Sequence, residues 1–268
     1  MATSVFRLPI ENFNEFEIHL IGTQLSDTGT GKSGRGSVVS EEISVAEAYS
    51  KGRTIFMGLE LLIAPGALVP RPETELLGTT ALDVLSQMNL PAPRVIDMCC
   101  GAGNLACAIA HYAPTALVWA SDLTDGCVEV ARRNVAHHVL ADRVSVLQGD
   151  LFSAFSGLKL DGTMDVIICN PPYISEKRLE GDRAHLTELE PREAFAAGPY
   201  GLSIHMRVIK DAPRYLRRGG ILLFEVGLGQ DRQVISLLER SKAYETIRAV
   251  TNEAGEGRVV MGHTTPQA

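Results

Sequence analysis

From residue 94 onward, short apolar runs rich in β-forming residues alternate with amphipathic helical runs, and this alternation limits the possible folds more than any other feature. Between residues 125 and 140, for example, Val128, Ala131, Val135 and Leu140 recur near helical spacing, which indicates a helix that buries one face. Such alternation predicts a doubly wound α/β domain, whose mostly parallel sheet is covered by helices on both faces. The expected strands are 94–97, 117–120, 144–147, 165–169 and 221–226, and the expected helices are 104–111, 125–137, 203–216 and 230–241.

The two ends of the chain depart from this alternation. Two further β-rich runs near the C-terminus, 245–249 and 258–262, predict an antiparallel hairpin that brings the sheet to seven strands. Residues 27–40 are rich in Gly and Ser and predict a flexible loop. We expect an N-terminal extension over 1–75 that helps to recognise the substrate, followed by the main ligand-binding domain over 76–268. Within the extension, we expect a strand at 16–21, a helix at 45–51 and a hairpin at 53–64.

The composition argues against several classes of protein. The net charge of −7 and the pI of about 5.5 make a nucleic-acid partner unlikely, because such proteins usually carry a basic face. The five cysteines are odd in number and lack paired spacings, so no metal site or disulfide framework is expected. No apolar run reaches the ~20 residues of a membrane span, and the first residues do not resemble a signal peptide. We therefore expect a cytoplasmic protein without a membrane partner; its oligomeric state is left open.

Acidic residues follow three of the expected strands. The first strand ends in Asp97 and leads into a turn of small residues that contains Gly101 and Gly103, where a ligand can approach the backbone closely. Asp122 ends the second strand, and Asp150 follows the third. A single acid here would be explained as a helix cap. Three at the same edge of a parallel sheet favour a ligand site, because ligands of doubly wound folds bind at the carboxyl ends of the strands.

A dinucleotide dehydrogenase is the obvious alternative for such a turn. Its Gly-x-Gly-x-x-Gly fingerprint tolerates the alanine at Ala106. The adjacent Cys99 and Cys100, and the loop that follows the fourth strand, fit a dehydrogenase poorly.

The fourth strand runs directly into Asn-Pro-Pro-Tyr at residues 170–173. The two prolines fix the backbone and remove two N–H donors, so this loop presents carbonyl groups. The side-chain oxygen of Asn170 and the carbonyl of Pro171 can accept both hydrogens of a substrate –NH2 group and so direct its lone pair. Tyr173 offers a flat face for a planar group. Catalysis would then come from orientation and desolvation.

Several longer motifs surround this loop. Residues 68–75 read Leu-Val-Pro-Arg-Pro-Glu-Thr-Glu, and residues 224–227 read Phe-Glu-Val-Gly. Further motif residues are Ile174, Glu190-Pro191, Ala194-Phe195, Gly198, Gly201-Leu202, Gln230 and Gly257-Arg258. With these motifs, the chain resembles S-adenosylmethionine (SAM)-dependent N-methyltransferases over about residues 52–262 and, more narrowly, the release-factor glutamine methyltransferases of the HemK type.

This resemblance implies a class I methyltransferase, Rossmann-like fold with SAM as the cofactor, whose sulfonium already activates the methyl group. Cofactor contacts are then expected at Asp97, Cys99, Gly101, Gly103, Asp122, Leu123, Asp150, Leu151 and Asn170. Asn170, Pro171 and Tyr173 are expected to be catalytic, and Arg71, Pro172, Tyr173 and Glu190 to contact the acceptor. Glu190 would select a cationic substrate.

The chain departs from the family pattern at two places. Cys99 stands where the family's first turn has its first glycine, and residues 1–50 are strand-like or Gly/Ser-rich where the family has a helical domain. These departures favour a small-molecule acceptor, with a planar guanidine or amide nitrogen in an amino acid or a specialised metabolite. The main alternative is a protein glutamine in a release factor. A nucleic-acid base disagrees with the charge and with the motif at 70–75, and a non-catalytic SAM-binding regulator disagrees with the intact loop at 170–173.

Overall fold

The computed structural model describes residues 44–181, 183–198 and 200–265. The chain divides into Met1–Glu41, of which no residue is described, and Glu42–Ala268. The predicted strand at 16–21 and the predicted loop at 27–40 lie outside the described residues. Among the described residues, no helix is long and apolar enough to cross a membrane.

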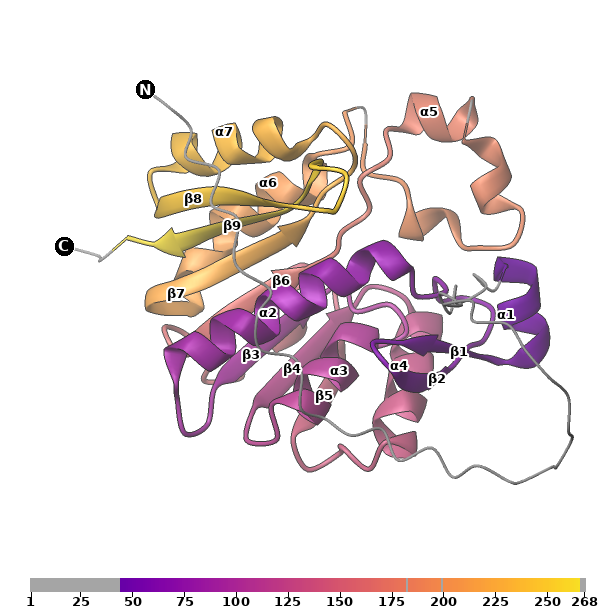
Figure 1. Ribbon diagram of the computed structural model, residues 1–268, viewed down its shortest axis with the longest axis horizontal. Coiled ribbons are helices and arrows are strands. Elements are labelled where there is room, and N and C mark those ends of the chain that lie inside the picture. The colour runs from indigo at the N-terminus through magenta and orange to yellow at the C-terminus, as the bar shows by residue number, and fades with distance from the viewer. Residues whose placement is uncertain (1–43, 182, 199, 266–268) are drawn as a thin grey trace, which may run out of the picture. The chain divides into compact units, whose positions relative to one another are not determined.

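A seven-stranded sheet in the order β5-β4-β3-β6-β7-β9-β8 forms the centre of the described structure (Figure 1). The pairs among the first five strands are parallel, and β9 pairs antiparallel with both β7 and β8. The predicted fold class is therefore confirmed, including the C-terminal hairpin. The strands are β3 (Arg94–Met98), β4 (Leu117–Asp122), β5 (Val144–Gln148), β6 (Met164–Cys169), β7 (Leu216–Glu225), β8 (Tyr244–Thr251) and β9 (Gly257–Thr264).

The sheet separates two hydrophobic cores, as its central strand shows. Val166 and Ile168 of β6 pack into one core, whereas Ile167 and Cys169 pack into the other, because successive side chains of a strand point to opposite faces. Residues of α2 (Glu75–Met88), α3 (Asn104–Tyr112) and α4 (Asp125–His137) complete the first core. Residues of α6 (Ser203–Asp211), α7 (Asp231–Ser241) and the 3-10 helix η2 (Leu151–Phe155) complete the second. The remaining helical segments are η1 (Pro72–Thr74), α5 (Glu176–Glu180), η3 (Ala184–Thr187), η4 (Arg192–Ala194) and η5 (Ala212–Arg214).

The sequence prediction lacked the short helix α5 and differs from the structure at two further helices. The helix predicted at 203–216 ends at Asp211, because Pro213 cannot continue an α-helix, and Leu216 already begins β7. Helix α2 was not expected at all, although the buried Leu77, Ala81 and Val84 follow helical spacing.

The hairpin of β1 (Arg53–Phe56) and β2 (Leu59–Leu62), together with α1 (Val45–Lys51), confirms the elements predicted at 45–51 and 53–64. The buried side-chain amide of Asn134 joins this hairpin to the turn after β3. Asn134 of α4 accepts a hydrogen bond from the Leu62 amide at 2.7 Å and donates to the Leu62 carbonyl at 3.0 Å. It also donates to the carbonyl of Ala102, in the turn after β3, at 2.9 Å. A single side chain therefore satisfies backbone groups of two different segments.

Replacing Asn134 with Ala should lower the free energy of unfolding by about 2–4 kcal/mol, since the part-buried amide and carbonyl of Leu62 and the buried carbonyl of Ala102 would lose their partner. Urea denaturation followed by circular dichroism would measure this loss. The matched control is Arg133→Ala on the exposed side of the same helix, which should change stability by less than about 0.5 kcal/mol. Equal stability of the two variants would contradict the structural role of the amide.

Candidate functional site

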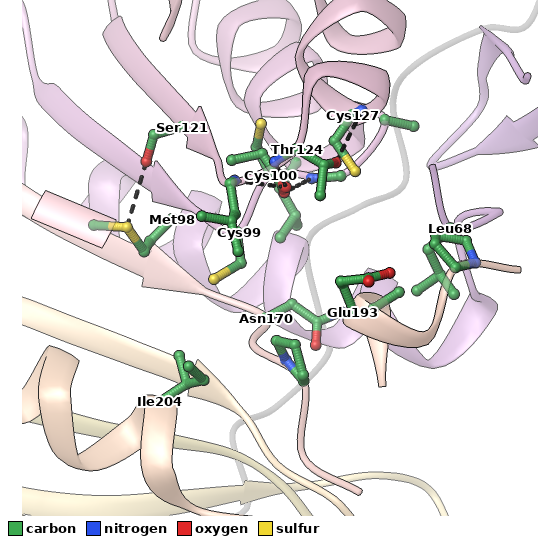
Figure 2. Close-up of a pocket in the computed structure, with 18 of the residues that line it drawn as sticks. Leu68, Met98, Cys99, Cys100, Ser121, Thr124, Cys127, Asn170, Glu193 and Ile204 are labelled. Carbon is green, nitrogen blue, oxygen red and sulfur yellow. Dashed lines mark hydrogen bonds between the residues drawn. The ribbon is translucent and has the colours of Figure 1, made fainter. Parts of the chain in front are cut away.

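A cavity of about 320 Å³ lies at the carboxyl ends of the parallel strands (Figure 2). Its wall combines the end of β3, the end of β4 and the loop that follows β6, which the parallel register brings to one edge. Figure 2 shows Cys99, Cys127, Asn170 and Ile204 around this space. The predicted site residues in its lining are Arg71, Cys99, Gly101, Asp122, Leu123, Asp150, Leu151, Asn170 and Pro172. The predicted site residues outside the lining are Asp97, Gly103, Pro171, Tyr173 and Glu190.

The turn after β3 leaves its backbone open to the cavity. Cys99 has a positive φ of 59°, an uncommon conformation for a residue with a side chain. The Gly101 amide donates to Oδ2 of Asp122 at 2.9 Å, which holds the turn against the end of β4. A Cβ added at Gly101 would meet no atom within 4 Å, so a ligand has room beside this backbone. The turn is thus suited to the close approach of a cofactor such as SAM.

Asp97 lies beneath this turn and not in the cavity wall. The residue is fully buried, and its Oδ2 accepts a hydrogen bond from the Ala106 amide of α3 at 2.9 Å. Among the described residues, its Oδ1 has no hydrogen-bond partner. Burial raises the pKa of the carboxyl to about 8. Its contact with the first turn of α3 indicates that it positions the turn of residues 98–103 from below.

The other two strand-end acids reach the cavity. Oδ1 of Asp122 accepts a hydrogen bond from the Leu123 amide at 2.8 Å, while its Oδ2 accepts from the Gly101 amide. Asp150 forms an exposed ion pair with Arg207 of α6, at 2.7 Å between Oδ2 and Nη2. A carboxylate oxygen has two lone pairs, so both acids can still accept hydrogen bonds from a ligand hydroxyl.

The loop at 170–173 is fixed from several distant parts of the chain. The Asn170 amide nitrogen, Nδ2, donates to Oγ1 of Thr74 at 3.1 Å. At the other end of the loop, Nε2 of Gln230 donates to the Tyr173 carbonyl at 3.0 Å, and the Gly227 amide donates to Oε1 of the same Gln230 at 3.0 Å. Because Nδ2 makes the bond to Thr74, the side-chain oxygen of Asn170, Oδ1, takes no part in that bond.

Gly201 and Gly227, both in the later motifs, lack side chains and so allow their backbone to pack closely against this loop. A Cβ at Gly201 would lie 2.4 Å from the Tyr173 carbonyl oxygen, and Gly201 also has a positive φ of 72°. A Cβ at Gly227 would lie 2.7 Å from Oε1 of Gln230 and 3.0 Å from Cδ2 of Tyr173. Both positions therefore require glycine because of close packing against the loop.

Behind Tyr173 lies a buried carboxylate, that of Glu225. The Tyr173 hydroxyl lies 3.4 Å from Oε1 of Glu225, and Nη2 of Arg258 lies 3.7 Å from the same oxygen. Burial raises the pKa of Glu225 to about 7, and burial together with this carboxylate raises the pKa of Tyr173 to about 12. The phenol therefore keeps its proton at neutral pH and can donate it to Glu225.

Glu190 is bound within the protein. It forms an ion pair with Arg71, and its Oε1 accepts from the Val69 amide at 3.0 Å. Both of its oxygens thus have partners in the segment 68–71, which leaves the carboxylate poorly placed to receive a cationic substrate. The pair instead joins that segment to the residues around η4, several of which line the cavity.

The segment between the loop at 170–173 and α6 is closed at its base by backbone hydrogen bonds. The Ile174 amide donates to the Phe195 carbonyl at 2.9 Å, and the Ala197 amide donates to the Ile174 carbonyl at 3.0 Å. Between these contacts lie α5, η3 and η4, with η4 in the cavity wall.

The sequence did not reveal several residues of the site. Thr74 falls within the motif at 68–75, but its contact with Asn170 joins residues 96 positions apart, and the sequence carries no signal for it. Cys127 and Ile204 belong to helices whose periodicity marks their buried faces but not a cavity.

Comparison with known proteins agrees with this geometry. Residues 77–187 match the family described as Methyltransferase small domain. The chain is 35% identical over 213 residues to the release factor glutamine methyltransferase of Gloeobacter violaceus, covering 80% of this chain and 72% of that protein. It is 34% identical over 231 residues to the protein of the same name from Rhodopirellula baltica, covering 85% of this chain and 74% of that protein.

Solved structures share the fold at low sequence identity. The hMettl16 catalytic domain, in complex with an RNA hairpin, has a TM-score of 0.57 at 15% identity and covers 82% of this chain and 90% of that one. A methyltransferase from Pyrococcus furiosus has a TM-score of 0.53 at 16% identity, covering 78% and 91%. At such identities the likeness supports the fold alone.

The buried Asp97 should make the stability of the protein depend on pH. Its pKa is about 8 in the folded protein against an ordinary 3.8, so the folded state binds the extra proton between these values. Stability from this group is therefore lost as the pH rises from about 4 to 8, by up to about 1.4 kcal/mol per pH unit. Asp97→Asn, which stays neutral, should remove this slope. Urea denaturation at several pH values would measure it, and parallel stability curves for the two proteins would contradict it.

Proposed function

The chain belongs to the release factor glutamine methyltransferase family of SAM-dependent methyltransferases, and from this we propose that it methylates the side-chain amide nitrogen of a glutamine in a release factor. The observation that carries the proposal is the donor-poor loop at 170–173, with Asn170 in the wall of the cavity. A glutamine side chain ends in a planar –NH2 group, which is the group that this loop is suited to bind.

This proposal replaces the small-molecule acceptor expected from the sequence, which is wrong. Relatives that match 79–85% of the chain at 32–35% identity are named release factor glutamine methyltransferase. That expectation rested on residues 1–50, most of which lie outside the described residues.

SAM, when bound, supplies a methyl group that its sulfonium makes electrophilic. We assign its binding to the turn after β3 and to the strand ends beside it. Gly101 offers open backbone, Asp122 and Asp150 offer acceptors for ligand hydroxyls, and Leu123 and Leu151 offer apolar surface. Cys99, within this turn, and Asn170 both line the same cavity, while Asp97 and Gly103 support the turn from outside the lining.

The acceptor nitrogen is oriented by the loop itself. Oδ1 of Asn170 and the carbonyl of Pro171 accept the two N–H hydrogens of the glutamine amide, and Tyr173 and Pro172 bound the plane of the group. Holding both hydrogens fixes the direction of the nitrogen lone pair, so orientation is the main catalytic contribution of these residues. The wall from η4, held by Arg71 and Glu190, excludes water from one side of this space.

Incubation of the protein with methyl-labelled SAM and a purified bacterial release factor should place label in the release factor, on a glutamine side chain. Mass spectrometry of the digested release factor would locate it. Label on another residue type, or no label in the protein at all, would contradict the proposed function.

Replacing Asn170 with Ala should lower kcat by about 100- to 1000-fold, because one of the two groups that orient the nitrogen is lost. The affinity for SAM, measured by calorimetry, should change by less than about twofold. Asn252→Ala, in the turn between β8 and β9 and outside the cavity lining, is the matched control and should keep wild-type activity. Undiminished turnover in the Asn170 variant would show that the loop is not catalytic.

A further inference from the structure

Thr74 lies behind the catalytic loop, with its side chain hydrogen-bonded to Asn170. The residue is 2% exposed and belongs to η1, within the motif at 68–75. Its hydroxyl oxygen is the partner of Asn170 Nδ2 at 3.1 Å. A hydroxyl has a single proton, so if Thr74 donates that proton elsewhere, it can only accept from Asn170.

The candidate to take that proton is the carboxylate of Glu225, which is 2% exposed and whose pKa responds to the neighbouring Thr74 hydroxyl. Its Oε1 faces the hydroxyl of Tyr173 and the guanidinium of Arg258. Its Oε2 is buried and has no hydrogen-bond partner among the described residues. An ionised carboxylate only accepts hydrogen bonds, and a buried oxygen without a donor is costly. In line with such a donor, hydrogen bonding by Thr74 lowers the pKa of Glu225 against the larger effect of burial.

We propose that Thr74 is a positioning residue: it donates its proton to Oε2 of Glu225, therefore accepts from Asn170, and so keeps Oδ1 of Asn170 turned toward the acceptor amide. This inference rests on the proposed function, since it concerns how the same loop binds the glutamine –NH2 group.

The direction of these hydrogen bonds matters because an asparagine amide has nearly the same shape after a half turn. In the reversed orientation, Asn170 would present its own N–H groups to the N–H groups of the substrate. Two sets of donors cannot pair, so the acceptor would lose the contact that orients it. An ionised Glu225 excludes the reversed orientation, whereas a protonated Glu225 can donate to Thr74 and permit it.

The surroundings of Glu225 determine when it is ionised. Arg258 of β9 favours the charged form and Glu73 of η1 opposes it, while the phenol of Tyr173 remains neutral. His205 of α6 faces the backbone carbonyl of Glu225 at 3.3 Å, and burial lowers the pKa of its ring to about 4, so it is uncharged at neutral pH. With a pKa of about 7, Glu225 is ionised above neutral pH and protonated below it. The orienting effect should therefore weaken as the pH falls below about 7.

The test compares Thr74→Val with Thr74→Ser in methyl transfer from SAM to a purified release factor. At pH 8, the Val variant should have a kcat at least tenfold below wild type, because Asn170 loses its partner while the shape of the side chain is kept. The Ser variant retains the hydroxyl and should stay within about threefold. The affinity for SAM, measured by calorimetry, should be unchanged in both and shows that both are folded.

The pH profile separates orientation from a merely structural role. The ratio of wild-type kcat to that of Thr74→Val should shrink between pH 8 and pH 6, because protonation of Glu225 removes the advantage of the wild type. Glu225→Gln is the second variant: it should also have a low kcat and lack the acidic limb of the profile. If it or the Val variant keeps the wild-type kcat and profile, the inference fails. If the wild-type protein itself places no methyl group on a release-factor glutamine, the proposed function fails instead.

Discussion

Parallel pairing of β3 with β4 and β6 is the constraint on which the site depends. It aligns Met98 with Ser121 on one side and with Cys169 on the other. The residues that follow in the chain, from the turn at Cys99 to the loop at Asn170, therefore emerge at one edge and enclose one space. The two cores on opposite faces of the sheet hold this register, because a shift by one residue would reverse the face to which every side chain of β6 points.

The loop at 170–173 has little structure of its own and takes its shape from its neighbours. Two prolines leave it with few donors, so the hydrogen bonds that hold it come from outside, through Gln230 at the Tyr173 carbonyl and through Thr74 at Asn170. Gly201 and Gly227 allow those neighbours to approach. Motif residues as far apart in the sequence as Thr74 and Gln230 therefore meet around this four-residue loop and support it.

The sequence predicted the fold well because periodicity and strand-helix alternation are local signals. It missed α2, whose buried spacing directly follows a proline-rich motif, and it extended α6 past Pro213. At the site it identified residue types at strand ends, but it could not distinguish Asp97, which binds the backbone of α3, from Asp122, which reaches the cavity. That distinction depends on burial. The internal partners of Glu190 and Thr74 come from segments about 100 residues away, and a single sequence carries no signal for such pairs.

The short bridge between Ile174 and Ala196 ties together the two ends of the segment that follows the loop at 170–173. Within this segment, Glu190 and η4 are held to the cavity wall, whereas α5 and η3 can change in length or sequence while Asn170 and Tyr173 stay in place. Evolution can therefore vary α5 and η3 without displacing the loop below them. An enzyme built in this way can alter one stretch of its surface with few adjustments elsewhere.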